Sequence, residues 1–136
     1  MTIEEKKRQL AINRLEQADE SIDEARYLFE GYKSPRAIIN RAYYAMFYAI
    51  LALLIFEEYG SLKHSGVLSY FNKNFVKNGI IPKYIGRYVN KAFDLRIRSD
   101  YREQIELTRK HVEPFLGQAE KFIGAVRNYL MNSGRL

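Results

Sequence analysis

The chain of 136 residues contains no cysteine and no tryptophan, and it has only three prolines. The lack of cysteine excludes disulfide bonds and metal sites built on thiolates. No uncharged apolar run reaches the roughly 20 residues of a membrane-spanning helix, and the nearest run, residues 42–56, is rich in tyrosine. The first residues carry glutamates instead of the basic start and apolar core of a signal peptide. We therefore expect a soluble, cytoplasmic protein without a membrane partner.

Helical periodicity runs through nearly the whole sequence. Capping residues mark the helix starts: Thr2 with Glu5, Ser34 before a proline, and Thr108. The predicted helices run up to residue 31, over residues 34–59, within 64–77, from 82 into the region 94–102, and over 108–131. Pro114 is expected to delay or kink the last of these helices, because it has no backbone N–H to donate. We predict an all-α fold, an antiparallel bundle of about five helices that forms one domain over residues 1–136.

Arg41 is the most unusual residue of the predicted second helix. It stands among Tyr43, Tyr44 and Tyr48 in the stretch 38–56, which is otherwise almost wholly apolar. Burying a guanidinium group without a partner is very costly, so an anionic or hydrogen-bonding group must meet it. That partner could be a carboxylate on another helix or a phosphate from outside the protein, and the sequence leaves both alternatives open.

Charge is distributed unevenly along the chain. Residues 1–31 carry eight acidic and five basic side chains, whereas residues 32–93 carry two acidic and nine basic ones. No carboxylate occurs from residue 60 to residue 93, where tyrosines and asparagines alternate with six cations: Lys63, Lys73, Lys77, Lys83, Arg87 and Lys91. A surface of one sign attracts polyanions, and aromatic side chains between the charges can stack on bases. The simpler alternative is a solvated basic face, or one that docks on the acidic first helix.

Two further polar clusters are candidate anion sites. The first is the segment 94–102, where Arg96, Asp100 and Tyr101 lie near a helix end; an arginine beside a tyrosine can grip a phosphate, although the charges could also pair among themselves. The second is Lys63 and His64 at the start of the third helix, where free backbone N–H groups favour an anion. A lone histidine in that position is more often an ordinary polar surface residue.

Taken together, these clusters resemble the HEPN superfamily, and more closely its small, stand-alone prokaryotic branch. The resemblance rests on three motifs, which are Arg41-Ala-Tyr-Tyr-Ala-x-Phe, Lys63-His64-Ser65-Gly66 and Leu95-Arg96-x-x-x-Asp100-Tyr101. It covers nearly the whole chain, from about residue 18 to residue 129. It implies a four-helix up-and-down core and a homodimer formed through the face that carries the motifs.

The resemblance also implies a function linked to RNA. Many relatives are encoded beside a minimal nucleotidyltransferase as toxin and antitoxin, and the active members are metal-independent ribonucleases that use an Arg-x(4–6)-His motif across the dimer cleft. We expect no cofactor and no metal ion. The residues expected to line the cleft and to bind nucleotide or RNA are Arg41, Tyr44, Lys63, His64, Arg96, Asp100 and Tyr101.

The sequence departs from the family pattern at the catalytic histidine. Arg96 matches the motif arginine, but Tyr101, Arg102 and Glu103 stand where the histidine is expected. A tyrosine with its ordinary pKa of about 10 is a poor base at neutral pH.

Three functions stay open as a result. The first is a non-catalytic module that binds nucleotide, RNA or a nucleotidyltransferase. The second is a ribonuclease toxin in which His64 and Arg96 are catalytic. In the third, Arg41 and Asp100 form a purely structural pair inside the bundle.

Overall fold

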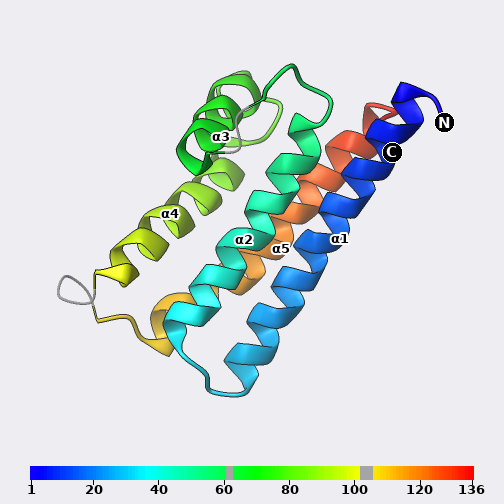
Figure 1. The fold of residues 1–136 in the computed structure, drawn as a ribbon. Helices are drawn as coiled ribbons and strands as arrows, with labels where there is room; N and C mark the ends of the chain where they lie inside the picture. Colours follow the sequence, from blue (N-terminus) through cyan, green and yellow to red (C-terminus); the bar gives the residue numbers. More distant parts are fainter. Residues whose placement is uncertain (61–62, 102–105) are drawn as a thin grey trace.

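The computed structural model describes residues 1–60, 63–101 and 106–136, and within these ranges it contains helices and no strand (Figure 1). The elements are α1 (Ile3–Glu30), α2 (Pro35–Leu54), α3 (His64–Phe71), the short π-helix η1 (Asn72–Val76), α4 (Lys83–Asp100) and α5 (Arg109–Asn132). The predicted all-α class is confirmed.

Four of the helices, α1, α2, α4 and α5, lie side by side and alternate in direction (Figure 1). The central helix is α2, because it packs against α1, α4 and α5. Helix α3 and η1 lie at the end of the bundle where α2 finishes, and the two chain termini meet at that same end (Figure 1). The fold is therefore an antiparallel bundle, as predicted, with α4 on the opposite side of α2 from α1.

The predicted capping residues begin their helices. The Thr2 hydroxyl accepts a hydrogen bond from the Glu5 backbone N–H at 3.1 Å, and Ser34 precedes Pro35 at the start of α2. At the start of α5, the Thr108 hydroxyl accepts from the His111 N–H at 3.3 Å, while the His111 ring nitrogen Nδ1 accepts from the Thr108 N–H at 3.2 Å. His111 therefore completes a reciprocal cap, a role that the sequence analysis did not foresee.

One predicted boundary is wrong, the end of the second helix. Helix α2 ends at Leu54 rather than near residue 59, because the chain turns there and places Phe56 under the Arg135 guanidinium and Tyr59 against Tyr70. Helix α5 begins at Arg109 despite Pro114, so the expected late start does not occur. Helix α4 ends at Asp100, within the predicted region 94–102, so Arg96 and Asp100 project from a regular helix.

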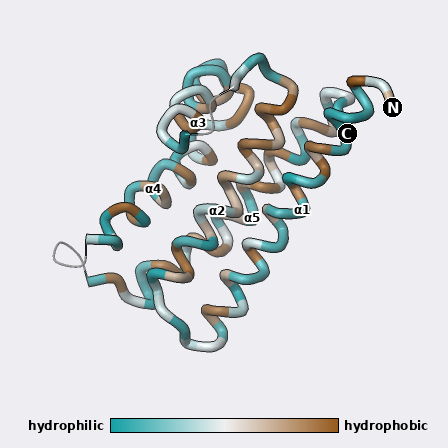
Figure 2. Tube along the Cα trace, in the orientation of Figure 1, coloured by the Kyte–Doolittle hydropathy of each residue, from teal (hydrophilic) through white to brown (hydrophobic). Residues whose placement is uncertain are grey.

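The core gathers around α2, in which thirteen residues are buried. Figure 2 shows that the second half of α2 is mostly apolar, whereas its first half carries polar residues. By length and composition alone this helix could cross a membrane, but 67 % of the stretch is buried inside the bundle. Packing against three other helices accounts for its apolar composition, as in the core helix of a globular domain.

Candidate phosphate-binding site

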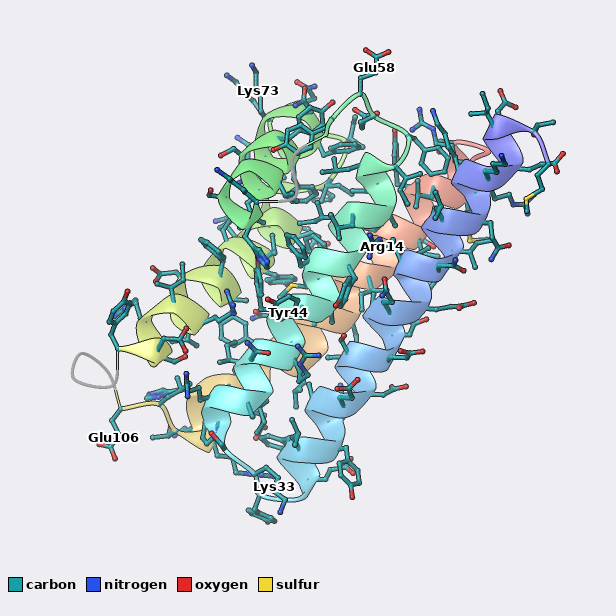
Figure 3. All side chains as sticks on the ribbon, viewed as in Figure 1. Arg14, Lys33, Tyr44, Glu58, Lys73 and Glu106 are labelled. Carbon is teal, nitrogen blue, oxygen red and sulfur yellow. The ribbon has the colours of Figure 1, made fainter. Side chains whose placement is uncertain are left out.

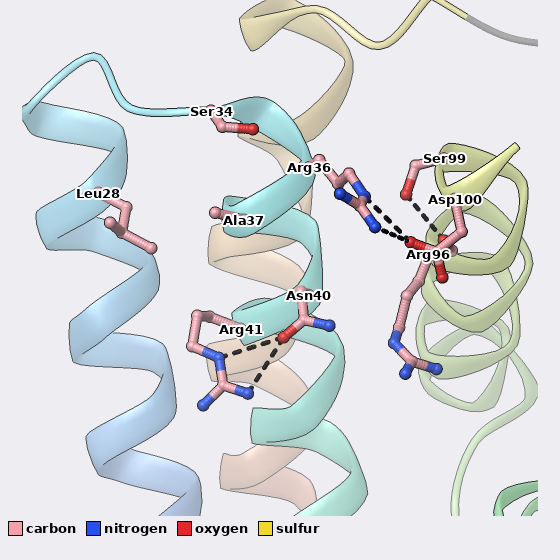
Figure 4. A pocket seen from close by; sticks show the side chains of 9 residues that line it. All are labelled: Leu28, Ser34, Arg36, Ala37, Asn40, Arg41, Arg96, Ser99 and Asp100. Atoms are coloured by element: carbon pink, nitrogen blue, oxygen red, sulfur yellow. Dashed lines mark hydrogen bonds and ion pairs between the residues drawn. The ribbon is translucent and has the colours of Figure 1, made fainter. Parts of the chain in front are cut away.

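A pocket of about 360 Å³ lies where α2 and α4 approach each other near the end of α1 (Figure 4). Its lining consists of Leu28, Ser34, Arg36, Ala37, Asn40, Arg41, Arg96, Ser99 and Asp100. Three arginines and one aspartate therefore face a single small space. A pocket with an excess of positive charge is suited to an anionic ligand.

Asp100 pairs with Arg36, not with Arg41. Its carboxylate oxygen accepts hydrogen bonds from Arg36 Nε at 3.0 Å and from the terminal nitrogen NH2 at 2.7 Å. Both side chains are about half exposed, so the pair is not a buried structural bridge. The hypothesis of a buried Arg41–Asp100 pair is wrong. Asp100 is the last residue of α4, and it lies beside Arg36 in the first turn of α2, more than one turn away from Arg41.

Arg41 lies at the edge of the bundle and not in its centre. The Asn40 side-chain oxygen accepts from Arg41 Nε at 3.3 Å and from NH2 at 3.1 Å. The nearest carboxylate, on Glu24 of α1, is 3.8 Å away, and the Arg41 side chain is 29 % exposed. Its guanidinium group also lies 5.0 Å from the centre of the Tyr44 ring. Arg41 thus keeps donor capacity that its neutral and distant partners do not use fully.

Arg96 is the least satisfied cation of the pocket. Its Nε is buried and has no hydrogen-bond partner among the described residues. Its guanidinium group packs on the rings of Tyr43 and Tyr44, at 5.3 and 5.2 Å from their centres, and one NH2 contact to the Tyr44 hydroxyl is long at 3.5 Å. A buried donor on a charged group normally has a partner. An added anion would supply one.

His64 lies next to Arg96, in an aromatic setting. Its ring stacks on Phe47 with centres 4.1 Å apart and meets the edge of Tyr44 at 5.5 Å. Its Nδ1 is 2.7 Å from the hydroxyl oxygen of Tyr43, a residue that is fully buried. Figure 3 shows Tyr44 about half-way along α2, where it contacts both Arg41 and Arg96. Tyr44 and Arg96 therefore join the pocket to His64.

The local environment fixes the protonation state of this histidine. Burial and the positive charge of Arg96 lower the pKa of His64, so the ring is neutral at neutral pH. Burial raises the pKa of Tyr43 well above its ordinary value, so its phenol keeps its proton. The described hydrogen bonds give that proton one acceptor, His64 Nδ1. In the tautomer in which the phenol donates to Nδ1, the ring hydrogen lies on Nε2 and neutral His64 is a hydrogen-bond donor on that side.

The lowered pKa of His64 predicts a pH-dependent stability. The unfolded chain takes up a proton near pH 6.5, the ordinary histidine value, while the folded protein resists protonation until lower pH. The contribution of His64 is thus complete above about pH 6.5 and is lost as the pH falls below it. In urea unfolding between pH 8 and pH 5, the wild type should lose more stability than His64→Gln. His111→Gln is the control, and parallel curves for wild type and His64→Gln would contradict the prediction.

The remaining predicted site residues lie elsewhere. Lys63 is the exposed N-cap residue of α3, and Tyr101, 61 % exposed, follows the last turn of α4; neither lines the pocket. Arg102 and Glu103, which stand with Tyr101 where the motif histidine is expected, lie outside the described residues.

Arg36 and Asn40 line the pocket but were not singled out from the sequence. Their spacing could have revealed them, because positions 36, 40, 41 and 44 form a polar stripe on an otherwise apolar helix. Over the described part of the chain, no group of three or more acidic or histidine side chains has the arrangement of a metal site.

Comparisons with known proteins agree with this architecture. The family model described as HEPN domain matches residues 12–129. A UPF0332 protein of Thermotoga maritima is 37 % identical over 83 % of this chain and 85 % of its own length. Two proteins of Methanocaldococcus jannaschii, each named "putative toxin", are 32 % and 34 % identical; they match 90 % and 85 % of this chain, and 82 % and 85 % of their own lengths. The chain belongs to the HEPN domain family.

Proposed function

We propose that this protein is a toxin-like HEPN module that binds the phosphate groups of RNA or of a nucleotide in the pocket between α2 and α4. Arg96 and Arg41 supply the positive charge, and the Asn40 side chain holds Arg41 in place through two hydrogen bonds. Guanidinium groups suit this role because their planar forks match phosphate oxygens.

The observation that carries the proposal is the buried Nε of Arg96, which has no partner within the described chain. A charged donor that the protein buries without a partner of its own is suited to an incoming acceptor. A phosphate oxygen in the pocket would accept a hydrogen bond from this Nε–H group, and that bond would contribute to the free energy of binding. The charge around the pocket also supports phosphate binding. Asp100 forms its ion pair with Arg36, so it does not pair with Arg96 or Arg41.

His64 contributes a neutral hydrogen-bond donor beside Arg96. Since Tyr43 donates to Nδ1, the Nε2–H group is available for a phosphate or ribose oxygen. The stack on Phe47 fixes the ring plane. This arrangement favours binding over catalysis, because a general base would need a lone pair on Nε2.

We further propose that the module works as a homodimer and engages a minimal nucleotidyltransferase. The half-exposed side chains of Arg41, Tyr44 and Tyr48 lie along one face of α2, and arginine and tyrosine are enriched in protein interfaces. Light scattering should then give twice the 16.0 kDa of the chain.

The proposed function is tested by competition with a labelled single-stranded RNA. Uridine 5′-monophosphate should displace a fluorescent oligouridine from the protein, whereas uridine, which lacks the phosphate, should not. The nucleoside is the matched control for base and sugar contacts. Equal competition by uridine would show that phosphate is not the recognised group and would overturn the proposal.

A second candidate function, a ribonuclease, is favoured by the position of a neutral His64 next to Arg96. Cleavage would require the opposite tautomer, in which Nδ1 donates to Tyr43 and Nε2 takes the proton of the 2′-hydroxyl. That oxygen would bond to phosphorus, the bond to the 5′ oxygen would break, and the protonated ring would return the proton to this leaving oxygen. Arg96 would stabilise the charge on the phosphorus centre.

The ribonuclease candidate predicts cleavage of a labelled tRNA and mRNA pool in EDTA that both His64→Ala and Arg96→Ala abolish. Arg127→Ala, which changes a surface ion pair with Asp19, is the control for contamination and for general effects of charge. Intact RNA at protein concentrations where binding is measurable would exclude this second function and leave the binding module.

A further inference from the structure

The outer face of α4 carries a row of three cations. Lys83, Arg87 and Lys91 follow one another at intervals of four residues, so they share one side of the helix at steps of about 6 Å. All three are exposed, and none forms an ion pair with any residue that the structure describes. Asp94, one turn further on, is occupied by Arg98 at 3.2 Å. We call Lys83, Arg87 and Lys91 the basic row.

A row of like charges at this spacing repels itself, which weakens the helix unless an anion compensates. The sequence provides no such anion nearby, since residues 60–93 contain no carboxylate. The acidic α1 lies across α2 from α4 (Figure 1). The field of the molecule therefore has a direction, and a polyanion is drawn to the α4 side.

Aromatic side chains run beside the basic row. Tyr84 is 56 % exposed, and its ring meets the ring of Tyr88 edge-on with centres 6.1 Å apart. Tyr88 itself packs on the core and supports one edge of the Tyr84 ring. An exposed ring held in this way is a platform on which an unpaired base can stack.

The element next to α4 is held rigidly and extends the positive charge. Asn72 of η1 and Asn90 of α4 exchange two hydrogen bonds of 3.0 Å, and Gly86 packs so closely that a Cβ there would lie 2.7 Å from a Val76 methyl group. On this clamped element Lys73 and Lys77 are exposed, and Figure 3 shows Lys73 extending away from the bundle.

We propose that the basic row and Tyr84 form a second surface, distinct from the pocket, that binds the backbone and bases of single-stranded RNA. This inference rests on the proposed function and deepens it: the substrate is an RNA strand and not a free nucleotide alone. The pocket takes one phosphate on the inner side of α4, and the outer surface adds affinity for the rest of the strand. Single strands fit better than duplexes, because only unpaired bases can stack on Tyr84.

The test compares two triple variants that remove equal charge. One replaces the basic row (Lys83→Gln, Arg87→Gln, Lys91→Gln), and the other replaces Lys7, Lys110 and Lys121 by glutamine, all exposed on α1 and α5. Binding of labelled oligouridine is followed by fluorescence anisotropy across a range of salt concentrations. Because each lost phosphate contact reduces the salt slope of single-strand binding by about 0.7, the row variant should be shallower by about 2. The control variant should keep the wild-type slope.

Tyr84→Ala tests the stacking part. It should weaken oligouridine binding roughly fivefold or more while leaving the salt slope and the binding of duplex RNA unchanged. Equal loss of single-strand and duplex binding would contradict a stacking role for Tyr84.

Further outcomes separate this inference from the proposed function. Uridine monophosphate should bind the row variant as it binds the wild type. If the row variant binds oligouridine normally while Arg96→Met does not, the second surface is refuted and the pocket stands; the reverse result refutes the pocket and supports the surface. If both triple variants change the salt slope of oligouridine binding equally, the basic row acts only through the net charge of the protein, and the inference is overturned. Binding to phosphatidylserine vesicles is measured as well. If the row variant loses vesicle binding that the wild type shows, but keeps its binding to oligouridine, the basic row binds a membrane surface and the inference is overturned.

Discussion

Replacing Arg96 with methionine is expected to weaken the binding of RNA and of uridine monophosphate roughly 10- to 100-fold. A hydrogen bond to a charged group contributes about 1.5–3 kcal/mol, and about 1.4 kcal/mol corresponds to a tenfold change in affinity. Methionine has a side chain of similar length that can pack on the Tyr43 and Tyr44 rings, although it loses the cation–π contacts of the guanidinium group. The loss should therefore appear in fluorescence anisotropy and calorimetry, while the far-ultraviolet circular dichroism spectrum stays that of the wild type.

Arg127→Met is the matched control for this substitution. Arg127 is also partly buried and pairs with Asp19 at 2.8 Å, away from the lining of the pocket. Arg127→Met removes the same charge from the protein as Arg96→Met. Because salt screens charges that lie far from the bound RNA, the Arg127→Met substitution should change the binding affinity by no more than about twofold. Equal weakening by both variants, or unchanged binding by a folded Arg96→Met protein, would contradict the assignment of Arg96.

Replacing Tyr43 with alanine is expected to destabilise the protein by about 3–5 kcal/mol, the range for removing a buried aromatic side chain. The Tyr43 ring is fully buried and contacts Tyr44, Phe47, His64 and Phe93. Tyr43 is thus part of the core, and it also supports the His64 ring through a stacking contact and a hydrogen bond. Urea unfolding followed by circular dichroism measures the loss.

Two variants separate the two roles of Tyr43. Tyr43→Phe keeps the ring and removes the hydroxyl that donates to His64, so it should cost about 1 kcal/mol. Tyr44→Ala removes a half-exposed neighbour and should cost clearly less than Tyr43→Ala. A loss below about 1 kcal/mol for Tyr43→Ala would contradict the burial of this ring, since cavities of that size are never so inexpensive in a packed core.

The sequence predicts the helices well where a local signal begins them. Thr2, Ser34 and Thr108 hold the N-cap positions they were expected to hold; Thr2 and Thr108 do so through side-chain hydrogen bonds, and Ser34 precedes a proline that starts the helix. The end of α2 is different. Apolar periodicity continues past Leu54, and the turn there depends on contacts of Phe56 and Tyr59 with residues far along the chain. No local pattern contains that information.

The candidate site was predictable only in part. The position of Arg41 in an apolar stretch made it a candidate, and the motif resemblance made His64 and Arg96 candidates. Which carboxylate meets which arginine depends on the rotation of α2 and α4 about their axes. That rotation brings Arg36 to Asp100 and leaves Arg41 at the boundary with α1, beside Asn40.

The role of His64 shows a second limit of sequence reasoning. A histidine near an arginine predicts a possible base, but the direction of its hydrogen bond decides its chemistry. That direction follows from the burial of Tyr43, a residue twenty-one positions earlier in the chain. In the proposed binding site, this contact gives His64 the role of a neutral hydrogen-bond donor instead of a general base.

The most direct test of the phosphate-binding pocket is a nuclear magnetic resonance titration that follows the Nε–H signals of the arginines. Uridine monophosphate is added to the protein, and the signals of Arg96 and Arg41 are compared with that of Arg127. We predict that the Arg96 signal shifts most, because its buried Nε has no partner among the described residues and would donate to the phosphate. Saturating nucleotide that moves the signals of other arginines and leaves Arg96 unchanged would contradict the account.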